Sequence, residues 1–445
     1  MCIRDRYSGE MNFDGLIGPT HNYSGLSEGN IASIKNSKQT SNPKKAALQG
    51  LKKMKLLMEL GFPQGIFLPH ERPHLGFLRD KGFKGNDKNI IASAAKKSRL
   101  LLNQAYSASS MWAANAATFS PSIDSYDSMA HITPANLLSM QHRSLETEFT
   151  YEQLNIIFHK SHFKVHNAIK PNEFLGDEGA ANHLRLSSNH LKKGLQVFVY
   201  GNEANQDHSN ILVRQSKEAS ELIAKLHMLD EGNIFFLKQN INSIKKGCFH
   251  NDIVSLATEN IFIYHEEAFE DSKKQISNLE TKLQSEKENF FIEISNQEIS
   301  LDILIKSYLL NSQLITKKNG EMAFIMPEEV NEHLECKRWL KKLKDETPIK
   351  DLRYIDIKQS MMNGGGPACL RFKIVVTEDE FNNINSDFIL NDNLILKLED
   401  LIQSSYRDAL EIDDLEDPDL ISESFEILDN LTQIFNTGSI YSFQK

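Results

Sequence analysis

A cysteine that directly follows a glycine-rich segment is the most informative chemical feature of this chain. Residues 363–369 read Asn-Gly-Gly-Gly-Pro-Ala-Cys and end at Cys369. Glycine permits unusual backbone angles and close approach of a ligand, and no Lys-Ser/Thr pair follows, which excludes a phosphate-binding P-loop. Cys369 stands where the loop meets a predicted strand, as a nucleophile would. The alternative is a buried structural cysteine, the commoner role for cysteines in general.

Two pairs of ionisable residues could act together with this thiol. His250 and Asp252 lie two residues apart, so in an extended strand they would face one pocket as a base and a cation ligand. Taken alone, a hydrogen-bonded histidine and an exposed aspartate is the simpler interpretation. Asp177 and Glu178 lie between glycines, which fits a tight site or an acidic turn.

Two arginines in polar loops could bind anions. Arg143, which follows His142, and Arg214 offer planar forks that match carboxylates, although most arginines are only surface charges. A thiol, a histidine and several acids without a metal motif suit attack of a thiolate on a cationic carbon. A guanidinium is such a target, because it stays charged and needs acids to hold it, and thiolate is the strongest side-chain nucleophile.

The string His70-Glu71-Arg72-Pro73-His74 matches the H-E-x-x-H pattern of zinc proteases. That pattern requires a helix, which puts both histidines on one face. Pro73 interrupts any such helix. The string therefore predicts a loop, and we expect no zinc site.

Composition sets the class of protein. The chain has 445 residues, of which 40% are hydrophobic and 25% charged, as in ordinary folded proteins. A net charge of −10 argues against general binding of nucleic acids. No apolar run is long enough to span a bilayer, and the start lacks the apolar region of a secretory signal. Four cysteines without a C-x-x-C pair predict free thiols in a reducing compartment rather than a disulfide framework.

Apolar patterns predict alternating strands and helices that must position these residues. One helix begins at Pro43, with Asn42 as its cap, and stops at Gly61. A second covers residues 216–229 and a third residues 301–309. Predicted strands cover residues 66–68, 196–200, 233–237, 253–257, 261–265, 290–294, 313–316, 322–326, 349–355 and 368–376.

The later strands recur at a similar spacing. Polar residues near the start of successive hairpins are Asp252, Gln313 and Cys369. Such a repeat suggests α/β modules around an axis, with these residues meeting at one central site. A plain α/β domain with similar spacings by chance is the alternative. Residues 1–10 carry no usable pattern, and we treat them as an N-terminal extension that need not be native.

Several segments in order resemble the succinylarginine dihydrolase family of guanidine-modifying enzymes. They read MNFDGLIGPTHNYSGLSEGNIAS, SASSMWAANAATFSPS, QHRSLE, LGDEGAANH, VRQSKEASE, CFHNDI and MMNGGGPACLRFK, and the match runs from about residue 11 to residue 443. The resemblance implies a pentein fold, a five-bladed pseudo-symmetric α/β-propeller of repeated strand and helix modules. It implies one catalytic domain over residues 11–445, a homodimer in the cytoplasm, and no metal or organic cofactor.

The resemblance also implies roles for individual residues. Cys369 would be the nucleophile, with His250 and Glu178 as the other catalytic residues. The residues that would bind substrate are Ser24, Gly25, Leu26, Ser27, Glu28, Gly29, Asn30, Ile31, Ala32, Ser33, Asn115, His142, Arg143, Arg214, Asp252 and Asn363.

The reaction implied by the family converts N2-succinyl-L-arginine and two waters to N2-succinyl-L-ornithine, two ammonia and carbon dioxide, in arginine catabolism. We expect Asp252 and Glu178 to pair with the guanidinium, and Arg143, Arg214 and backbone N–H groups of residues 24–33 to bind the carboxylates.

Other interpretations remain open. The chain could be an arginine deiminase-like hydrolase, an amidinotransferase, or an inactive module that binds an arginine derivative. A papain-like acyl hydrolase fits poorly, because Cys369 lacks the C-G-S-C-W surroundings.

Overall fold

The described part of the chain forms five three-stranded sheets. The computed structural model describes residues 7–172, 174–203, 212–283 and 287–445. In every sheet the middle strand is antiparallel to one neighbour and parallel to the other. The sheets are β15-β1-β2, β3-β4-β5, β6-β7-β8, β9-β10-β11 and β12-β13-β14.

The strands are β1 (Gly9–Gly15), β2 (Gln64–Phe67), β3 (Ala117–Ser120), β4 (Ala130–Pro134), β5 (Phe163–Val165), β6 (His183–Leu186), β7 (Leu195–Tyr200), β8 (Ile234–Lys238), β9 (Ser255–Thr258), β10 (Ile261–His265), β11 (Phe290–Ile294), β12 (Gln313–Thr316), β13 (Met322–Pro327), β14 (Ile349–Ile355) and β15 (Arg371–Val376). The α-helices are α1 (Ile31–Lys35), α2 (Pro43–Glu59), α3 (Leu75–Asp80), α4 (Asp87–Lys97), α5 (Arg99–Ala105), α6 (Gln141–Ser144), α7 (Thr147–Ile157), α8 (Lys217–Leu226), α9 (Ile241–Lys245), α10 (Ser272–Lys282), α11 (Leu301–Ser307), α12 (Leu334–Glu346), α13 (Lys358–Met362), α14 (Glu378–Asn382), α15 (Asp392–Ser405) and α16 (Pro418–Ile434).

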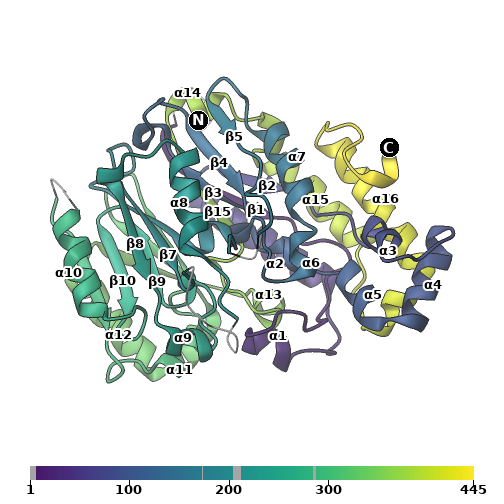
Figure 1. Ribbon diagram of the computed structural model, residues 1–445, viewed down its shortest axis with the longest axis horizontal. Helices are drawn as coiled ribbons and strands as arrows, with labels where there is room; N and C mark the ends of the chain where they lie inside the picture. Colours follow the sequence, from purple (N-terminus) through teal and green to yellow (C-terminus); the bar gives the residue numbers. More distant parts are fainter. Residues whose placement is uncertain (1–6, 173, 204–211, 284–286) are drawn as a thin grey trace.

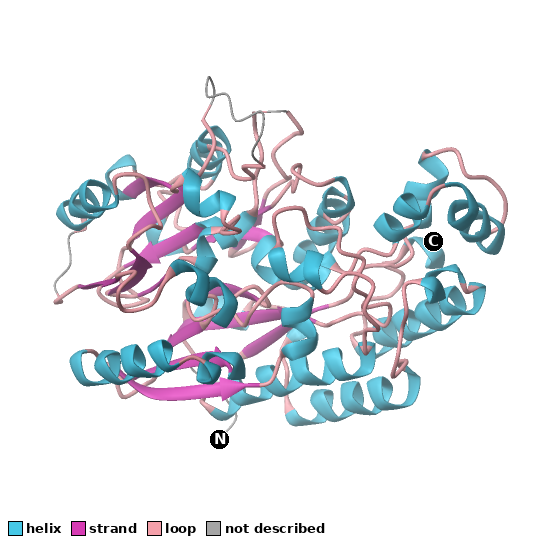
Figure 2. Ribbon diagram, turned by 90° about the horizontal axis from the view of Figure 1, so that it is seen from below, coloured by secondary structure: helices cyan, strands magenta, loops and turns pink. Residues whose placement is uncertain are grey.

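The sheets are arranged around an axis. Strands β3, β6, β9, β12 and β15 each begin one repeat of the pattern, and they contact one another across neighbouring sheets: β15 with β3, and β9 with both β6 and β12. Helices lie around the outside of the sheets (Figures 1 and 2). This is a five-bladed α/β-propeller, which confirms the predicted fold class.

Most predicted elements are present, and local chemistry explains their ends. The side chain of Asn42 accepts a hydrogen bond from Lys45 N at 2.7 Å and caps α2, with Pro43 in its first turn. Ser216 caps α8 by accepting from Ala219 N. The predicted hairpin over residues 313–326 forms with Gln313 opposite Ile325.

The first blade is closed by strands that lie far apart in the sequence. β15 pairs with β1 from Gly9 opposite Val376 to Asp14 opposite Arg371, and β2 adds in parallel on the other side. Glu10 is buried and paired with Arg371 at 3.1 Å. The predicted boundary after residue 10 therefore falls inside β1, because this strand is needed to complete a blade. Residues 1–6 of the predicted extension lie outside the described residues.

Helices α3, α4, α5 and α16 form a separate cluster to the right of the sheets in Figure 1, with its own apolar core. His70 to Pro73 precede α3, and His74 is its N-cap, so the predicted loop in place of a zinc-binding helix is confirmed.

Within the described part of the chain, no helix combines the length and apolar character needed to cross a bilayer. The described cysteines Cys248, Cys336 and Cys369 are free and buried, and Cys2 lies outside the described residues.

A buried ion pair joins helix α2 to strand β1. Lys53 of α2 and Asp14 of β1 are fully buried and hydrogen-bonded to each other, and Gln64 of β2 donates to the second oxygen of Asp14 at 3.0 Å. Burial raises the pKa of Asp14 and lowers that of Lys53. The pair is therefore held by its own attraction, against the cost of removing both charges from water.

We predict that Lys53→Met lowers the free energy of unfolding by about 3 to 5 kcal/mol, because Asp14 is left as an unpaired buried charge. Urea unfolding at pH 7 measures the change. The exposed pair of Lys44 and Asp408 provides the control, since Lys44→Ala should cost at most about 1 kcal/mol. Adding Asp14→Asn to Lys53→Met should recover part of the loss; no loss in the single variant would contradict this account.

Candidate active site

Short turns in front of the inner strands supply the side chains of the site. The 3₁₀ turns η3 (Ala113–Asn115), η5 (Gly179–Asn182) and η7 (Asn251–Ile253) precede β3, β6 and β9. His250 is the N-cap of η7 and Asp252 lies within it. The prediction that both residues belong to a strand is therefore wrong, since the strand begins only at Ser255. The turn nevertheless directs His250 toward Glu178 and Asp252 toward Cys369, and these two groups of residues form the two halves of the site.

The first half surrounds Cys369. Its thiol donates to Asp252 Oδ2 at 3.2 Å and accepts from Asn311 Nδ2 at 3.1 Å. Burial, followed by the charge of Asp252, raises the pKa of the Cys369 thiol well above its usual value. Burial also raises the pKa of Asp252 to about 6. At neutral pH the free site therefore holds a protonated thiol beside a largely ionised carboxylate.

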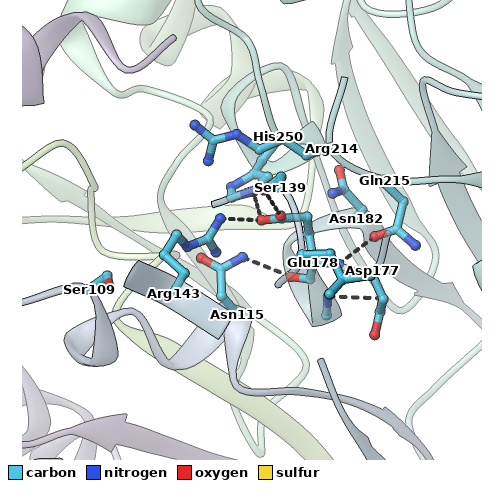
Figure 3. A network of polar contacts seen from close by, with 12 residues as sticks. Ser109, Asn115, Ser139, Arg143, Asp177, Glu178, Asn182, Arg214, Gln215 and His250 are labelled. Carbon is cyan, nitrogen blue, oxygen red and sulfur yellow. Dashed lines mark hydrogen bonds and ion pairs between the residues drawn. The ribbon is translucent and has the colours of Figure 1, made fainter. Parts of the chain in front are cut away.

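The second half surrounds Glu178. Figure 3 shows Arg143, His250 and Ser139 converging on its carboxylate. Oε2 accepts from Arg143 Nη1 and from His250 Nε2, the latter at 2.7 Å, and Oε1 accepts from Ser139 Oγ at 2.6 Å. Burial alone would raise the pKa of Glu178, but Arg143 and His250 outweigh it and hold that pKa well below its usual range.

The state of His250 follows from this partner. Burial lowers the pKa of His250 to about 4 although Glu178 opposes the shift, so the ring is neutral at pH 7. An ionised carboxylate can only accept, so Nε2 carries the ring proton and donates it to Glu178. Nδ1 is left as the acceptor, which is the form a general base needs.

Backbone contacts join the two halves. The Asn115 side chain donates to the carbonyl of Glu178 at 2.8 Å, and the neighbouring Ala114 N–H donates to the carbonyl of Cys369 at 3.1 Å. His250 and Asp252 come from one turn. The three predicted catalytic residues and Asn115 therefore belong to one site.

The predicted substrate residues lie mostly beside it. A pocket is lined by Ser24, Gly25, Leu26, Ser27, Ser33, His142 and Asn363 of the predicted set, together with Asn22, Ser107, Ala108, Ser109 and Trp112. Asn30 caps α1 and donates to the carbonyl of Gly364 at 2.8 Å, so the predicted loop is fastened to the glycine-rich segment. Burial lowers the pKa of His142 to about 3, so it enters the pocket neutral.

Arg214 approaches from another blade. Its Nη2 donates to the carbonyl of Glu28 at 2.6 Å, and its guanidinium lies 4.2 Å from the ring centre of Phe249. Burial lowers the pKa of Arg214 to about 9, which leaves it charged at pH 7.

The loop does not direct every predicted side chain inward. Glu28 and Gly29 are exposed, and only the carbonyl of Glu28 reaches Arg214. Ile31 is 54% exposed and, with Ala32, lines a groove beside Phe249 rather than the pocket. The helical turn of α1 explains this, because it rotates residues 31 and 32 away from Ser33.

Sequence reasoning missed Asn311 and Ser139 and chose Gln313 as a converging residue. Gln313 lies within β12, whereas Asn311 occupies the turn before it and contacts both Asp252 and Cys369. Asn311 is 59 residues from Asp252 and 58 from Cys369, a more even repeat than Gln313 gives. Asn311 could have been identified from the sequence by looking at the residues just before the predicted strand that starts at Gln313.

The buried polar atoms of the site without a hydrogen-bond partner among the described residues include Asp252 Oδ1, Arg143 Nη2 and Arg214 Nε. Buried polar groups are nearly always satisfied. An acid and two guanidinium groups with free hydrogen-bonding capacity match a ligand with one cationic and one anionic end. Among the described residues, no three His, Cys, Asp or Glu side chains are grouped so as to hold a metal ion.

We predict that Asp252→Asn increases the reactivity of Cys369 in the free protein. This substitution removes a negative charge beside the sulfur, so the thiol pKa falls and more thiolate is present at pH 7. For every pH unit by which the thiol pKa falls, alkylation by iodoacetamide should become about tenfold faster. Peptide mass spectrometry at Cys369 measures the rate, and Asp408→Asn, on the exposed surface, should leave it unchanged. Slower alkylation in Asp252→Asn would refute the charge effect.

Comparisons with known proteins identify the family. The family model for succinylarginine dihydrolase matches residues 7–444. The N-succinylarginine dihydrolases of Shewanella denitrificans and Aeromonas hydrophila are each 46% identical over 442 residues, which cover 98% of this chain and 99% of each relative.

Solved structures share the fold. The apo structure of ArgZ, an arginine dihydrolase from the ornithine–ammonia cycle in cyanobacteria, has a TM-score of 0.52 at 14% identity, over 86% of this chain and 42% of that chain. A mutant of the ArgZ N-terminal domain bound to its substrate gives 0.51 at 14% identity, over 82% and 98%. At this identity the likeness concerns the fold alone. The match to the family model and the full-length relatives decide the family: the chain belongs to the succinylarginine dihydrolases.

Proposed function

We propose that this chain hydrolyses N2-succinyl-L-arginine, with two waters, to N2-succinyl-L-ornithine, two ammonia and carbon dioxide, as a step of arginine catabolism. One observation carries the proposal. The thiol of Cys369 contacts Asp252, whose second oxygen is unpartnered among the described residues, and the turn that holds Asp252 also holds a His250–Glu178 pair. The family to which the chain belongs supports the identity of the substrate.

The two ends of the substrate fit the two kinds of free group. The guanidinium pairs with Asp252, which brings its carbon to the Cys369 sulfur. Both oxygens of Glu178 are already engaged by Ser139, Arg143 and His250. We therefore assign Glu178 to orienting His250 rather than to holding the guanidinium, which revises the prediction that both acids pair with substrate. The substrate carboxylates take the free N–H groups of Arg143 and Arg214.

Binding of the cation prepares the nucleophile. The positive guanidinium cancels the charge of Asp252, so the thiolate form of Cys369 becomes more favourable. The thiol proton passes to His250 Nδ1, and the sulfur adds to the guanidinium carbon. His250 returns this proton to one amino group, the C–N bond breaks and ammonia departs. The carbon stays bonded to the Cys369 sulfur as a cationic S-alkylthiouronium.

Water then releases the first product. His250 takes a proton from water as the hydroxide adds to the same carbon. The C–S bond breaks, and the thiolate regains the proton from His250. The added hydroxyl group loses its own proton to solvent, where the released ammonia can take it, and a neutral ureido group remains. Hydrolysis of this ureido group consumes the second water and yields the second ammonia, carbon dioxide and the ornithine amine.

The proposal is tested by the products. Purified protein with N2-succinylarginine should release two ammonia for each succinylornithine formed, whereas an arginine deiminase-like enzyme would release one and leave a ureido product. An amidinotransferase would need an acceptor amine and release none. Binding without ammonia release would show an inactive module. Free arginine, which lacks the succinyl carboxylate, should be turned over poorly.

We also propose that the protein acts in the cytoplasm as a homodimer, on the basis of the family resemblance. Light scattering coupled to size-exclusion chromatography tests the second part, and a mass equal to one chain would refute it.

We predict that Cys369→Ser lowers turnover by about three orders of magnitude or more, because a hydroxyl is a far weaker nucleophile than a thiolate. Calorimetry should still detect binding of succinylarginine. Cys336→Ser is the matched control, since Cys336 is also buried but contacts Ser307 in α11. Substantial turnover by Cys369→Ser would remove the thiol from the mechanism.

We predict that Arg214→Ala raises the KM for succinylarginine about tenfold to a hundredfold, because a charge-assisted hydrogen bond to the carboxylate is lost. The expected change in kcat is small. Initial rates of ammonia release measure both constants. Arg79→Ala, which removes an exposed arginine paired with Asp87, serves as the control. An unchanged KM in Arg214→Ala would place Arg214 outside the binding site.

A further inference from the structure

Asn311 is a fully buried side chain that contacts the reacting sulfur. Its Nδ2 donates to Cys369 Sγ at 3.1 Å and to the carbonyl of Asp252 at 3.3 Å. Its Oδ1 accepts from Gly366 N at 2.8 Å and from Cys369 N at 3.4 Å. One amide thus connects the nucleophile, the acid beside it and the glycine-rich segment.

These contacts determine which way the amide faces. Oδ1 receives backbone N–H groups, which only an acceptor can do, so the NH₂ group is the part that meets the sulfur. The segment is also pressed against this residue: a Cβ at position 366 would lie 2.6 Å from the carbonyl oxygen of Asn311 and 2.7 Å from its Oδ1. Ala368 N donates to the same carbonyl at 3.2 Å. The amide therefore has little freedom to turn its NH₂ group away from Cys369.

The surroundings of the sulfur oppose its ionisation. Burial disfavours a negative charge on Cys369, and so does Asp252, whereas the hydrogen bond from Asn311 favours it, with a smaller contribution from the backbone N–H of Gly366. His250 directs its ring N–H to Glu178 in the free site, so that proton is not available to the sulfur. A donor already aimed at the place where charge develops needs no rearrangement when the thiol ionises.

We propose that Asn311 is a further catalytic residue, whose side-chain N–H stabilises the thiolate of Cys369 after the substrate cation has paired with Asp252. The role of the substrate in this statement rests on the proposed function. The effect on the sulfur itself does not, and is measurable in the free protein. It is a donor analogous to one in an oxyanion hole, directed at the nucleophile rather than at the substrate oxygen.

The test is the pH dependence of Cys369 alkylation by iodoacetamide in the free protein. Asn311→Ala removes the donor without adding charge. We expect the thiol pKa to rise by about one pH unit, which slows alkylation about tenfold below that pKa. Asn311→Asp keeps an acceptor for Gly366 N but replaces the donor with a negative charge, so the pKa should rise further. In Asn311→Ala, kcat for succinylarginine should fall about tenfold or more while KM changes little.

Asn182 offers a matched control. It is a buried asparagine in the equivalent turn before β6, it accepts from Asn251 N at 2.8 Å, and it is not among the hydrogen-bond partners of Cys369. Asn182→Ala should therefore leave the alkylation profile unchanged, even if it lowers the melting temperature.

The outcomes separate the two proposals. If Asn311→Ala lowers the melting temperature but leaves the alkylation profile unchanged, Asn311 only supports the loop and the inference is wrong. If Asn311→Ala does not fold, an unchanged profile in Asn311→Asp refutes it equally. If the profile moves as expected but the unaltered protein releases no ammonia from succinylarginine, the donor role on sulfur stands and the proposed function fails.

Discussion

The negative charge of Asp252 beside the Cys369 sulfur is the interaction on which the site depends. It helps burial to keep the thiol protonated in the free protein, because two adjacent negative charges in a buried site are unfavourable. The proposed substrate reverses this, since a guanidinium neutralises the acid as it binds. Selectivity and activation then have the same origin: a ligand without a positive charge leaves the sulfur unreactive. A buried thiol protected in this way is also a poor target for oxidants, which attack the thiolate.

The same repulsion between negative charges explains why Asp252 and Glu178 are held apart. Glu178 is surrounded by Arg143, His250 and Ser139, so its charge is balanced within the protein and does not add to that of Asp252 (Figure 3). Two free carboxylates next to the thiol would raise its pKa further and would compete for the one cation. The propeller makes this division possible, because each acid comes from the turn of a different blade and is fixed by its own neighbours.

Local sequence patterns predicted much of the fold. Asn42, Pro43 and Gly61 delimit α2 through capping and backbone chemistry that act within a few residues. The pairing of β1 with β15 could not be found in this way, since it joins positions such as Glu10 and Arg371 that are 361 residues apart. The five-bladed arrangement was predicted from the family resemblance. The spacing of the strands alone fitted a plain α/β domain equally well.

In the site, residue type indicated a thiol, a histidine and several acids, and the family resemblance singled out Cys369, His250 and Glu178 as a group. Neither predicted which partners these residues take. The sequence indicates Arg143 as a ligand for substrate carboxylates, and its contact with Glu178 depends on how α6 packs beside η5. Asn311 was missed because asparagine is common in turns and carries no charge. Its importance lies in its position before β12, which only the spatial repeat of the blades makes evident.

The closure of the first blade also has a consequence for how the protein is made. β1 is translated long before its antiparallel partner β15, since Glu10 and Arg371 are 361 residues apart. Until β15 has been made, the edge of β1 opposite β2 therefore has no partner, and such an edge can associate with other chains. Cys369, the proposed nucleophile, lies just before β15, so a chain that ends before this strand also lacks that thiol. Long-range pairing of this kind folds slowly, and chaperones that shield β1 during translation would benefit this protein more than one built from local hairpins.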